Sequence, residues 1–325
     1  MSEPLLEIED LHVWFGLKGD AELHAVQGVS FAVGKGERFG LVGESGCGKT
    51  TTILALMGLL PPNASVAGRV LLDGENILAE GEATISSHRW RDIAMVFQGA
   101  MNAFNPVKTV GNQIVEPMEL HEIAEGKAAW RRAGELLETV GIAASRARRY
   151  PHEFSGGMRQ RAAIAMALAC NPKVLLADEP TTALDVMVQA QILELLTGLA
   201  NDFGLSLVLV THDLPVVAQV CERAAVMYAG EIMEVGPMDA LYHDPRHPYT
   251  RLLFAATPDL LGEGEVVSIP GVPPRLDRVI PGCPFAPRCD RTFSPCPTVK
   301  PRLLKVADGQ EAACHLNDPA LVKAS

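Results

Sequence analysis

The sequence predicts an α/β fold built on a parallel sheet. Two short apolar runs, "KVLLAD" from Lys173 and "SLVLVTH" from Ser206, are typical of strands buried on both faces of a sheet. Between them, apolar residues recur at the spacing of a helix face from Ile192 to Phe203, and Gly204 follows as a helix stop. Alternation of helices with buried strands indicates this fold class.

Other segments predict the elements that accompany the parallel sheet. Residues 5–15, "LLEIEDLHVWF", alternate apolar and polar side chains, which indicates a half-buried strand. Residues 69–78, "RVLLDGENIL", indicate a hairpin that turns at Asp73-Gly74. Residues 102–149 are polar and helix-prone and interrupt the alternation. We therefore expect a helical insert at about residues 99–165.

The prolines divide the chain into two parts. Fourteen of the 23 prolines fall at or after Pro237, in the last 89 residues. This shift predicts a first domain over residues 1–236 and a small extension, rich in cysteine and proline, over residues 237–325.

Charge and hydropathy exclude some classes of function. The formal net charge is −11, from 28 basic and 39 acidic residues, which disfavours a nucleic-acid partner because such binding depends on Lys and Arg at phosphates. The N-terminal residues carry acids where a signal peptide carries positive charge, and we find no apolar run long enough to span a bilayer. We expect a cytosolic chain whose membrane role, if any, depends on partner chains.

A phosphate-binding loop is predicted at residues 43–51. "GESGCGKTT" fits the pattern G-x-x-x-x-G-K-[ST] and lies between an apolar, strand-like run and a helix-like one. In such a P-loop, glycines let backbone N–H groups surround phosphate oxygens at a helix N-terminus. Lys49 would reach the β- and γ-phosphates, and Thr50 would ligate Mg²⁺. The expected ATP-binding residues here are Gly43, Glu44, Ser45, Gly46, Cys47, Gly48, Lys49, Thr50 and Thr51.

Polar residues follow several of the predicted strands. Asp178 and Glu179 end "KVLLADEP", where Asp178 would serve the Mg²⁺ shell and Glu179 would polarise the attacking water. Gln98 ends "MVFQ", and His212 of "VTHD" lies at the end of the next apolar run. Taken alone, Gln98 means little and His212 is more often structural, but the phosphate loop upstream favours a catalytic role for the carboxylates.

A second anion site is predicted at "FSGGMRQR". Ser155 and two glycines precede the helix-like "AAIAMALA", so another helix N-terminus with backbone donors is available. Two phosphate-binding helix ends with a single lysine-bearing loop favour a dimer. Each nucleotide would then lie between the loop of one chain and the serine-glycine turn of the other.

Together, "GESGCGKTT", "MVFQ", "FSGGMRQR", "LLADEP", "TALD" and "VTHD", in this order, resemble the nucleotide-binding subunit of an ATP-binding cassette (ABC) transporter over roughly residues 5–236. The resemblance implies a RecA-like core with a β-subdomain and a helical insert. It implies an active ATPase with Glu179, His212 and Gln98 as catalytic residues, and Mg²⁺ held through Thr50, Gln98 and Asp178.

The same resemblance assigns roles to further residues. Ser155 and Gly157 would contact the γ-phosphate across the dimer, Gly156 between them is also expected to bind ATP, and Asp185 of "TALD" would link the two sites. Phe15, or Trp14 beside it, would stack on adenine.

Three positions depart from the family pattern. Phe154 replaces the usual Leu, Met158 the usual Gln and Cys47 the usual Ser. The phosphate-contacting residues are retained, so we expect an active site.

Residues 99–114, "HPYT" at His247 and "IPGVPPRL" at Ile269 narrow the resemblance to importers of oligopeptides, dipeptides and nickel. It implies a sister ATPase subunit as a heterodimer partner, two transmembrane permease subunits and, indirectly, an extracytoplasmic solute-binding protein. The chain would lie at the cytoplasmic face of the membrane as a peripheral protein. Peptides are the favoured solute, with nickel or oligosaccharides as alternatives, and a non-transport ABC ATPase is the rival function.

Four cysteines gather in the extension, with the spacing Cys283-x5-Cys289-x6-Cys296-x17-Cys314. In a reducing compartment such a group favours metal over disulfides, and the spacing is not that of a common zinc ribbon. An iron–sulfur cluster, structural zinc and free thiols remain the alternatives, and the family resemblance implies a 4Fe–4S cluster. Two other cysteines, Cys170 and Cys221, are expected to pack in the core.

Overall fold

The computed structural model describes residues 4–18, 21–99, 103–182, 184–256 and 268–322. Residues 100–102 of the predicted insert and Ala183 of "TALD" lie outside the described residues. The chain forms two compact units. The helical unit comprises Gly34–Glu37 and Glu80–Leu209, and the phosphate-loop unit comprises Pro4–Val33, Arg38–Ala79 and Val210–Ser325.

The phosphate-loop unit contains a four-stranded sheet with the order β2-β1-β4-β5. The strands are β1 (Pro4–Gly16), β2 (Glu22–Gly34), β4 (Ala64–Leu72) and β5 (Glu75–Asn76). The predicted strand and hairpin are both confirmed, since β1 pairs antiparallel with β4 and β4 with β5. Asp73 and Gly74 both have positive φ, 50° and 82°, as the tight hairpin turn requires.

A second group of strands in this unit has the order β11-β12-β10-β9-β3. The strands are β3 (Arg38–Val42), β9 (Arg223–Tyr228), β10 (Glu231–Pro237), β11 (Leu304–Ala307) and β12 (Gln310–Ala312). β3 and β9 are parallel, whereas β10 is antiparallel to both β9 and β12. The C-terminal extension therefore adds two strands to a sheet that begins far upstream, which the sequence did not indicate.

Aromatic rings join the extension to the rest of the phosphate-loop unit. Tyr228 of β9, Tyr249 and Phe285 are all fully buried. The ring centroids of Tyr228 and Tyr249 lie 4.7 Å apart, and those of Tyr249 and Phe285 lie 5.2 Å apart. Such pairs contribute beyond their buried area. The helices of this unit are α1 (Lys49–Leu56), α7 (Leu214–Val220), α8 (Met238–His243), α9 (Pro248–Ala255), η4 (Ala286–Arg288), η5 (His315–Asn317) and α10 (Pro319–Val322).

The helical unit confirms the alternation of strands and helices. Its strands are β6 (Ile93–Val96), β7 (Val174–Asp178) and β8 (Ser206–Thr211), whose C-terminal end enters the other unit. β6 and β7 are parallel, and β7 is also next to β8 in the sheet. Between β7 and β8 runs α6 (Val186–Phe203), which ends at Gly204 with φ 62°. The predicted helix and its stop signal are therefore confirmed.

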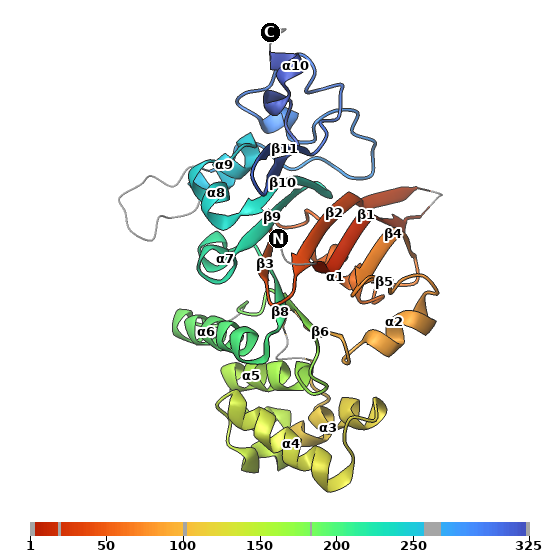
Figure 1. The fold of residues 1–325 in the computed structure, drawn as a ribbon, viewed down its shortest axis with the longest axis vertical. Coiled ribbons are helices and arrows are strands. Elements are labelled where there is room, and N and C mark those ends of the chain that lie inside the picture. Colours follow the sequence, from red (N-terminus) through yellow and green to blue (C-terminus); the bar gives the residue numbers. More distant parts are fainter. Residues whose placement is uncertain (1–3, 19–20, 100–102, 183, 257–267, 323–325) are drawn as a thin grey trace. The chain divides into compact units, whose positions relative to one another are not determined.

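Most of the predicted insert is helical. Its elements are α3 (Val110–Leu120), α4 (Gly126–Thr139), η2 (Ala144–Arg148), η3 (Pro151–Glu153) and α5 (Gly156–Ala167), and α2 (Glu82–His88) precedes it. Figure 1 shows α3, α4 and α5 in yellow and green as neighbouring helices, and α4 contacts α3, α5 and η2. Gly111 permits this packing, because a Cβ there would lie 2.6 Å from the Trp130 ring and 2.7 Å from the Ala147 carbonyl.

Two helical glycines should therefore respond oppositely to alanine. In Gly111→Ala the new methyl overpacks the α3–α4 contact, and we expect a loss of about 1–3 kcal/mol in the free energy of unfolding. Gly198 of α6 has no atom within 4 Å of a built Cβ. There the gain in helix propensity should add about 0.5–1 kcal/mol. Urea denaturation of both variants measures the difference. A destabilised Gly198→Ala together with a neutral Gly111→Ala would contradict this packing.

Candidate functional site

The phosphate loop lies between β3 and α1, as the motif predicts. Gly43, Gly46 and Gly48 all have positive φ, at 149°, 78° and 106°. A Cβ on Gly43 would lie only 2.1 Å from the Met227 carbonyl oxygen. At Gly43, therefore, both the backbone conformation and the space require glycine.

Lys49 is buried at the start of α1. Its Nζ donates to the carbonyl oxygens of Gly43 at 2.7 Å and Glu44 at 3.1 Å, and contacts Cys47 Sγ at 3.6 Å. These are neutral acceptors within the loop itself. A phosphate would compete well with them, since a charged acceptor bonds an ammonium more strongly.

Glu44 receives contacts from two residues of the C-terminal region. Its backbone N–H donates to the Tyr249 hydroxyl at 3.0 Å. Its carboxylate accepts two hydrogen bonds from the Arg288 guanidinium, at 2.6 and 3.0 Å. Sequence reasoning gave Glu44 a place in the loop but missed both partners.

Cys47, at the position where the family usually has serine, is 4% exposed. Burial raises the pKa of its thiol, and the Lys49 ammonium offsets only part of that effect. The side chain is therefore a neutral thiol at neutral pH and fits the loop as a small, apolar group.

The carboxylates lie at the end of β7 in the helical unit. Asp178 is its last residue and is 1% exposed. Glu179 has a positive φ of 43°, and its Oε2 accepts hydrogen bonds from Gln98 Nε2 at 2.7 Å and Thr182 Oγ1 at 2.9 Å. The structure thus brings together two of the predicted catalytic residues. Thr182, which no motif singled out, helps to fix the carboxylate.

The serine-glycine turn starts a helix, as predicted. Ser155 is the N-cap of α5, and its Oγ accepts from the Met158 N–H at 3.3 Å. A Cβ on Gly157 would lie 2.9 Å from Val188 of α6. Asp185 is likewise the N-cap of α6 and accepts from the Val188 N–H at 3.0 Å. Asp185 therefore has a structural role as a cap, whatever else it contacts.

The remaining predicted residues lie in the phosphate-loop unit. His212 directly follows β8 and is exposed. Phe15 lies near the end of β1 and is half-buried. The neighbouring Trp14 stacks on His24 with 4.6 Å between ring centroids. Because successive side chains on a strand point to opposite faces, Phe15 points away from that stack.

The four C-terminal cysteines line one small cavity, together with His247 and Phe285. Burial raises the pKa of Cys283 to about 12 and that of Cys314 to about 11. Within the described ranges, no three His, Cys, Asp or Glu side chains form a group that could hold a single metal ion. Cys170 and Cys221 are buried in the core, as predicted.

His247 is one of the residues that line this cavity. It is 1% exposed, and burial lowers its pKa to about 3, so its imidazole is neutral. Nδ1 accepts from the Tyr249 N–H at 3.0 Å, which leaves the proton on Nε2. Nε2 is buried and has no hydrogen-bond partner among the described residues.

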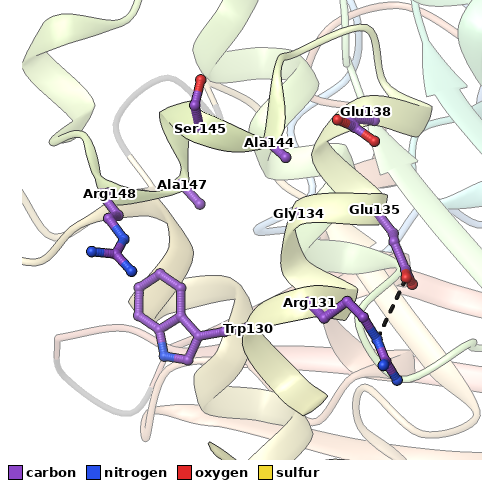
Figure 2. A pocket seen from close by; sticks show the side chains of 9 residues that line it. All are labelled: Trp130, Arg131, Gly134, Glu135, Glu138, Ala144, Ser145, Ala147 and Arg148. Carbon is purple, nitrogen blue, oxygen red and sulfur yellow. Dashed lines mark ion pairs between the residues drawn. The ribbon is translucent and has the colours of Figure 1, made fainter. Parts of the chain in front are cut away.

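A separate pocket lies in the helical unit, between α4 and η2 (Figure 2). Its lining combines Trp130 with charged groups, among them Arg148 and the Arg131–Glu135 ion pair of 3.7 Å. Predicted ATP-binding residues do not line it. It offers a mixed aromatic and charged surface rather than a nucleotide site.

Comparison with known proteins identifies the family. The sequence profile of the family "ABC transporter" matches residues 26–182, and that of "Oligopeptide/dipeptide transporter, C-terminal region" matches residues 233–296. The dipeptide transport ATP-binding protein DppD of Bacillus subtilis is 46% identical over 321 residues, which cover 97% of this chain and 96% of that protein. The chain belongs to this oligopeptide/dipeptide family of ABC transporter ATP-binding proteins.

Other members of the family differ in length. The oligopeptide transport ATP-binding protein OppD of Mycobacterium tuberculosis is 48% identical over 316 residues, which cover 96% of this chain but 52% of that protein. The chain thus spans about half the length of the mycobacterial relatives that it matches.

Solved structures confirm the ABC fold. The ATP-binding cassette MJ0796, in a dimeric post-hydrolysis state bound to ADP and Pi, matches with a TM-score of 0.64 and 28% identity over 72% of this chain and 98% of that chain. Among the described residues, no helix is both long enough and apolar enough to cross a bilayer.

The burial of Cys47 makes its reactivity testable. Because the thiol is protonated and shielded at neutral pH, we expect iodoacetamide to modify Cys47 far more slowly in the folded chain than in the unfolded chain. Peptide mass spectrometry measures both rates. Cys47→Ser should bind MgADP within about threefold of the wild type, since a hydroxyl replaces the weak sulfur acceptor of Lys49. Rapid modification of Cys47 in the folded chain would contradict this description of the loop.

Proposed function

We propose that the chain binds MgATP and hydrolyses it to drive import of a solute through partner membrane subunits. The observation that carries this proposal is the match to DppD over nearly the full length of both proteins. Oligopeptides or dipeptides are the favoured solutes, because the relatives bear those names and the C-terminal profile is specific to that group. Nickel and oligosaccharides are the alternatives within the same transporter class.

In this proposal the phosphate loop binds the nucleotide. Backbone N–H groups of residues 43–51 and the N-terminus of α1 bind the phosphates, and Lys49 exchanges its loop carbonyls for phosphate oxygens. Thr50 ligates Mg²⁺ and Phe15 stacks on adenine. The two carbonyls that Lys49 bonds are neutral, so a phosphate can replace them, and this supports the role of Lys49.

Hydrolysis depends on the carboxylates in the helical unit. Glu179 polarises the attacking water, and Asp178 and Gln98 serve the Mg²⁺ shell. His212 contacts the γ-phosphate. The two hydrogen bonds on Glu179 Oε2 support its role, because they hold the carboxylate in one orientation before a water binds.

The proposed partners follow from the serine-glycine turn. Ser155, Gly156 and Gly157 act on the nucleotide bound by a second cassette, and Asp185 links the two sites. That second cassette is a sister ATPase subunit, so that the pair is a heterodimer. Two permease subunits and, indirectly, an extracytoplasmic solute-binding protein complete the importer, with this chain at the cytoplasmic face of the membrane.

We also infer that Cys283, Cys289, Cys296 and Cys314 hold a 4Fe–4S cluster with a structural role. The support for this inference is that the four thiols line one cavity, whose wall also contains the buried His247. Zinc holds its thiolates about 2.3 Å from one ion, so they lie close together. A four-iron cluster instead binds its thiolates on separate irons, and zinc stays the alternative.

The base is tested by Glu179→Gln, which keeps the size of the side chain and its contacts. Removing a general base costs on the order of 10²–10⁴-fold in rate. We expect ATP hydrolysis to fall by that range, measured as phosphate release, with MgATP affinity retained. Glu194→Gln, on the exposed face of α6, is the matched control and should be unchanged. Turnover of Glu179→Gln within about twofold of the wild type would remove Glu179 from this role.

The cluster is tested by metal analysis of anaerobically purified protein. We expect about four irons per chain and a broad absorbance in the visible range. Serine in place of any one of the four cysteines should abolish both, whereas Cys170→Ala, in the core, should keep them. Colourless protein with one zinc per chain would replace the cluster with a zinc site, and metal-free protein with four titratable thiols would exclude both.

A further inference from the structure

The C-terminal region fixes one residue of the phosphate loop at two points. The Tyr249 hydroxyl accepts from the Glu44 N–H at 3.0 Å, and Arg288 forms a two-pronged ion pair with the Glu44 carboxylate at 2.6 and 3.0 Å. Arg288 and Glu44 are 244 positions apart in sequence. The backbone orientation and the side chain of Glu44 are therefore both determined by residues outside the loop.

Arg288 itself is held rigidly. Its side chain is 4% exposed, against 27% for that of Glu44. Its other hydrogen bonds go to the Tyr228 hydroxyl at 3.1 Å and to the carbonyls of Pro270 at 2.7 Å and Ile269 at 3.4 Å. The guanidinium also lies over the Tyr228 ring, 5.6 Å from its centroid. Such an arginine is far more constrained than a surface ion-pair partner, so little side-chain entropy opposes its bond to Glu44.

The geometry of Glu44 bears directly on the phosphate site. The Glu44 carbonyl is one of the acceptors of Lys49 Nζ, and the Cys47 N–H also donates to it, at 3.3 Å. Rotating the Glu44 peptide would therefore displace the lysine and the turn that presents the loop N–H groups. A loop that is already ordered binds its ligand with a smaller loss of conformational entropy.

We propose that Arg288 is a positioning residue for nucleotide binding. Through Glu44, and together with the Tyr249 hydroxyl, it holds the phosphate loop in its binding conformation, so the C-terminal region sets the affinity of the chain for nucleotide. This inference rests on the proposed function, because it concerns the same nucleotide site. Arg288 lies outside every cassette motif, so the inference assigns a role at the nucleotide site to a residue that those motifs do not include.

The test is calorimetric titration of the full-length chain with MgADP, which gives both the dissociation constant and the number of competent sites. For Arg288→Gln we expect a dissociation constant raised about tenfold, the scale of a lost charged hydrogen-bond pair, with the number of sites unchanged. Arg288→Lys keeps the charge without the fork and should be intermediate. A merely structural role would lower the number of sites and leave the dissociation constant of the folded fraction unchanged.

The matched control is Arg251→Gln. Arg251, on α9, forms an ion pair with Asp290 in the same C-terminal segment at 2.5 Å, and the bond does not involve the phosphate loop. Its loss should change the dissociation constant by less than about twofold, as for an exposed pair. An equal effect of Arg251→Gln and Arg288→Gln would overturn the proposal.

A double-mutant cycle identifies the route through Glu44. If Arg288 acts through that carboxylate, Arg288→Gln combined with Glu44→Gln should bind no more weakly than the weaker single variant. Losses in affinity that multiply in the double variant would overturn the proposal.

Should Arg288→Gln not fold, Tyr249→Phe and Arg288→Lys take its place, and unchanged affinity in both would also overturn the proposal. Wild-type protein that fails to bind MgADP would overturn the proposed function as well, whereas tight wild-type binding with unaffected variants would overturn this inference alone.

Discussion

The phosphate loop is packed directly against backbone, and this close approach determines much of the phosphate-loop unit. Gly43 lies where a Cβ would meet the Met227 carbonyl, and Gly48 lies where one would come within 2.8 Å of the Ala25 carbonyl. The Gly230 N–H donates to the Cys47 carbonyl at 2.9 Å, which ties the loop to the turn after β9. These contacts to backbone leave the loop little freedom to rearrange, as a preorganised anion site requires.

Local features of this molecule could be predicted from the sequence because they depend on neighbouring residues. Alternation predicted β1, the dipeptide Asp73-Gly74 predicted the β4–β5 turn, and Gly204 marked the end of α6. The glycine-rich loop and the serine that caps α5 could likewise be predicted. Contacts between distant residues could not be predicted. The pairing of β12 with β10, the bond from Thr182 to Glu179 and the ion pair from Arg288 to Glu44 each depend on how the chain folds back, and no periodicity or spacing encodes them.

Two buried cations, Lys49 and Arg288, have different kinds of partner in a chain whose formal net charge is −11. Lys49 is bonded to neutral carbonyls, which a phosphate can displace at little loss. Arg288 is bonded to a carboxylate in a two-pronged pair, and removing either partner would leave a poorly solvated charge. The lysine is thus suited to exchange partners and the arginine to keep them. Lysine, as a compact point charge, and arginine, as a planar fork, match these two tasks.

The cysteine segment and the phosphate loop share structural elements. Arg288 is the last residue of η4, which lies between Cys283 and Cys289, and the Cys283 N–H donates to the Cys296 carbonyl at 2.8 Å. Phe285 lines the cysteine cavity and also packs on Tyr249, whose hydroxyl accepts from Glu44. In the absence of metal the raised pKa values keep the Cys283 and Cys314 thiols neutral, so a metal centre there must displace protons as it binds. The cysteine segment and the nucleotide loop are therefore connected in the structure through the short helix η4 and the Arg288–Glu44 ion pair.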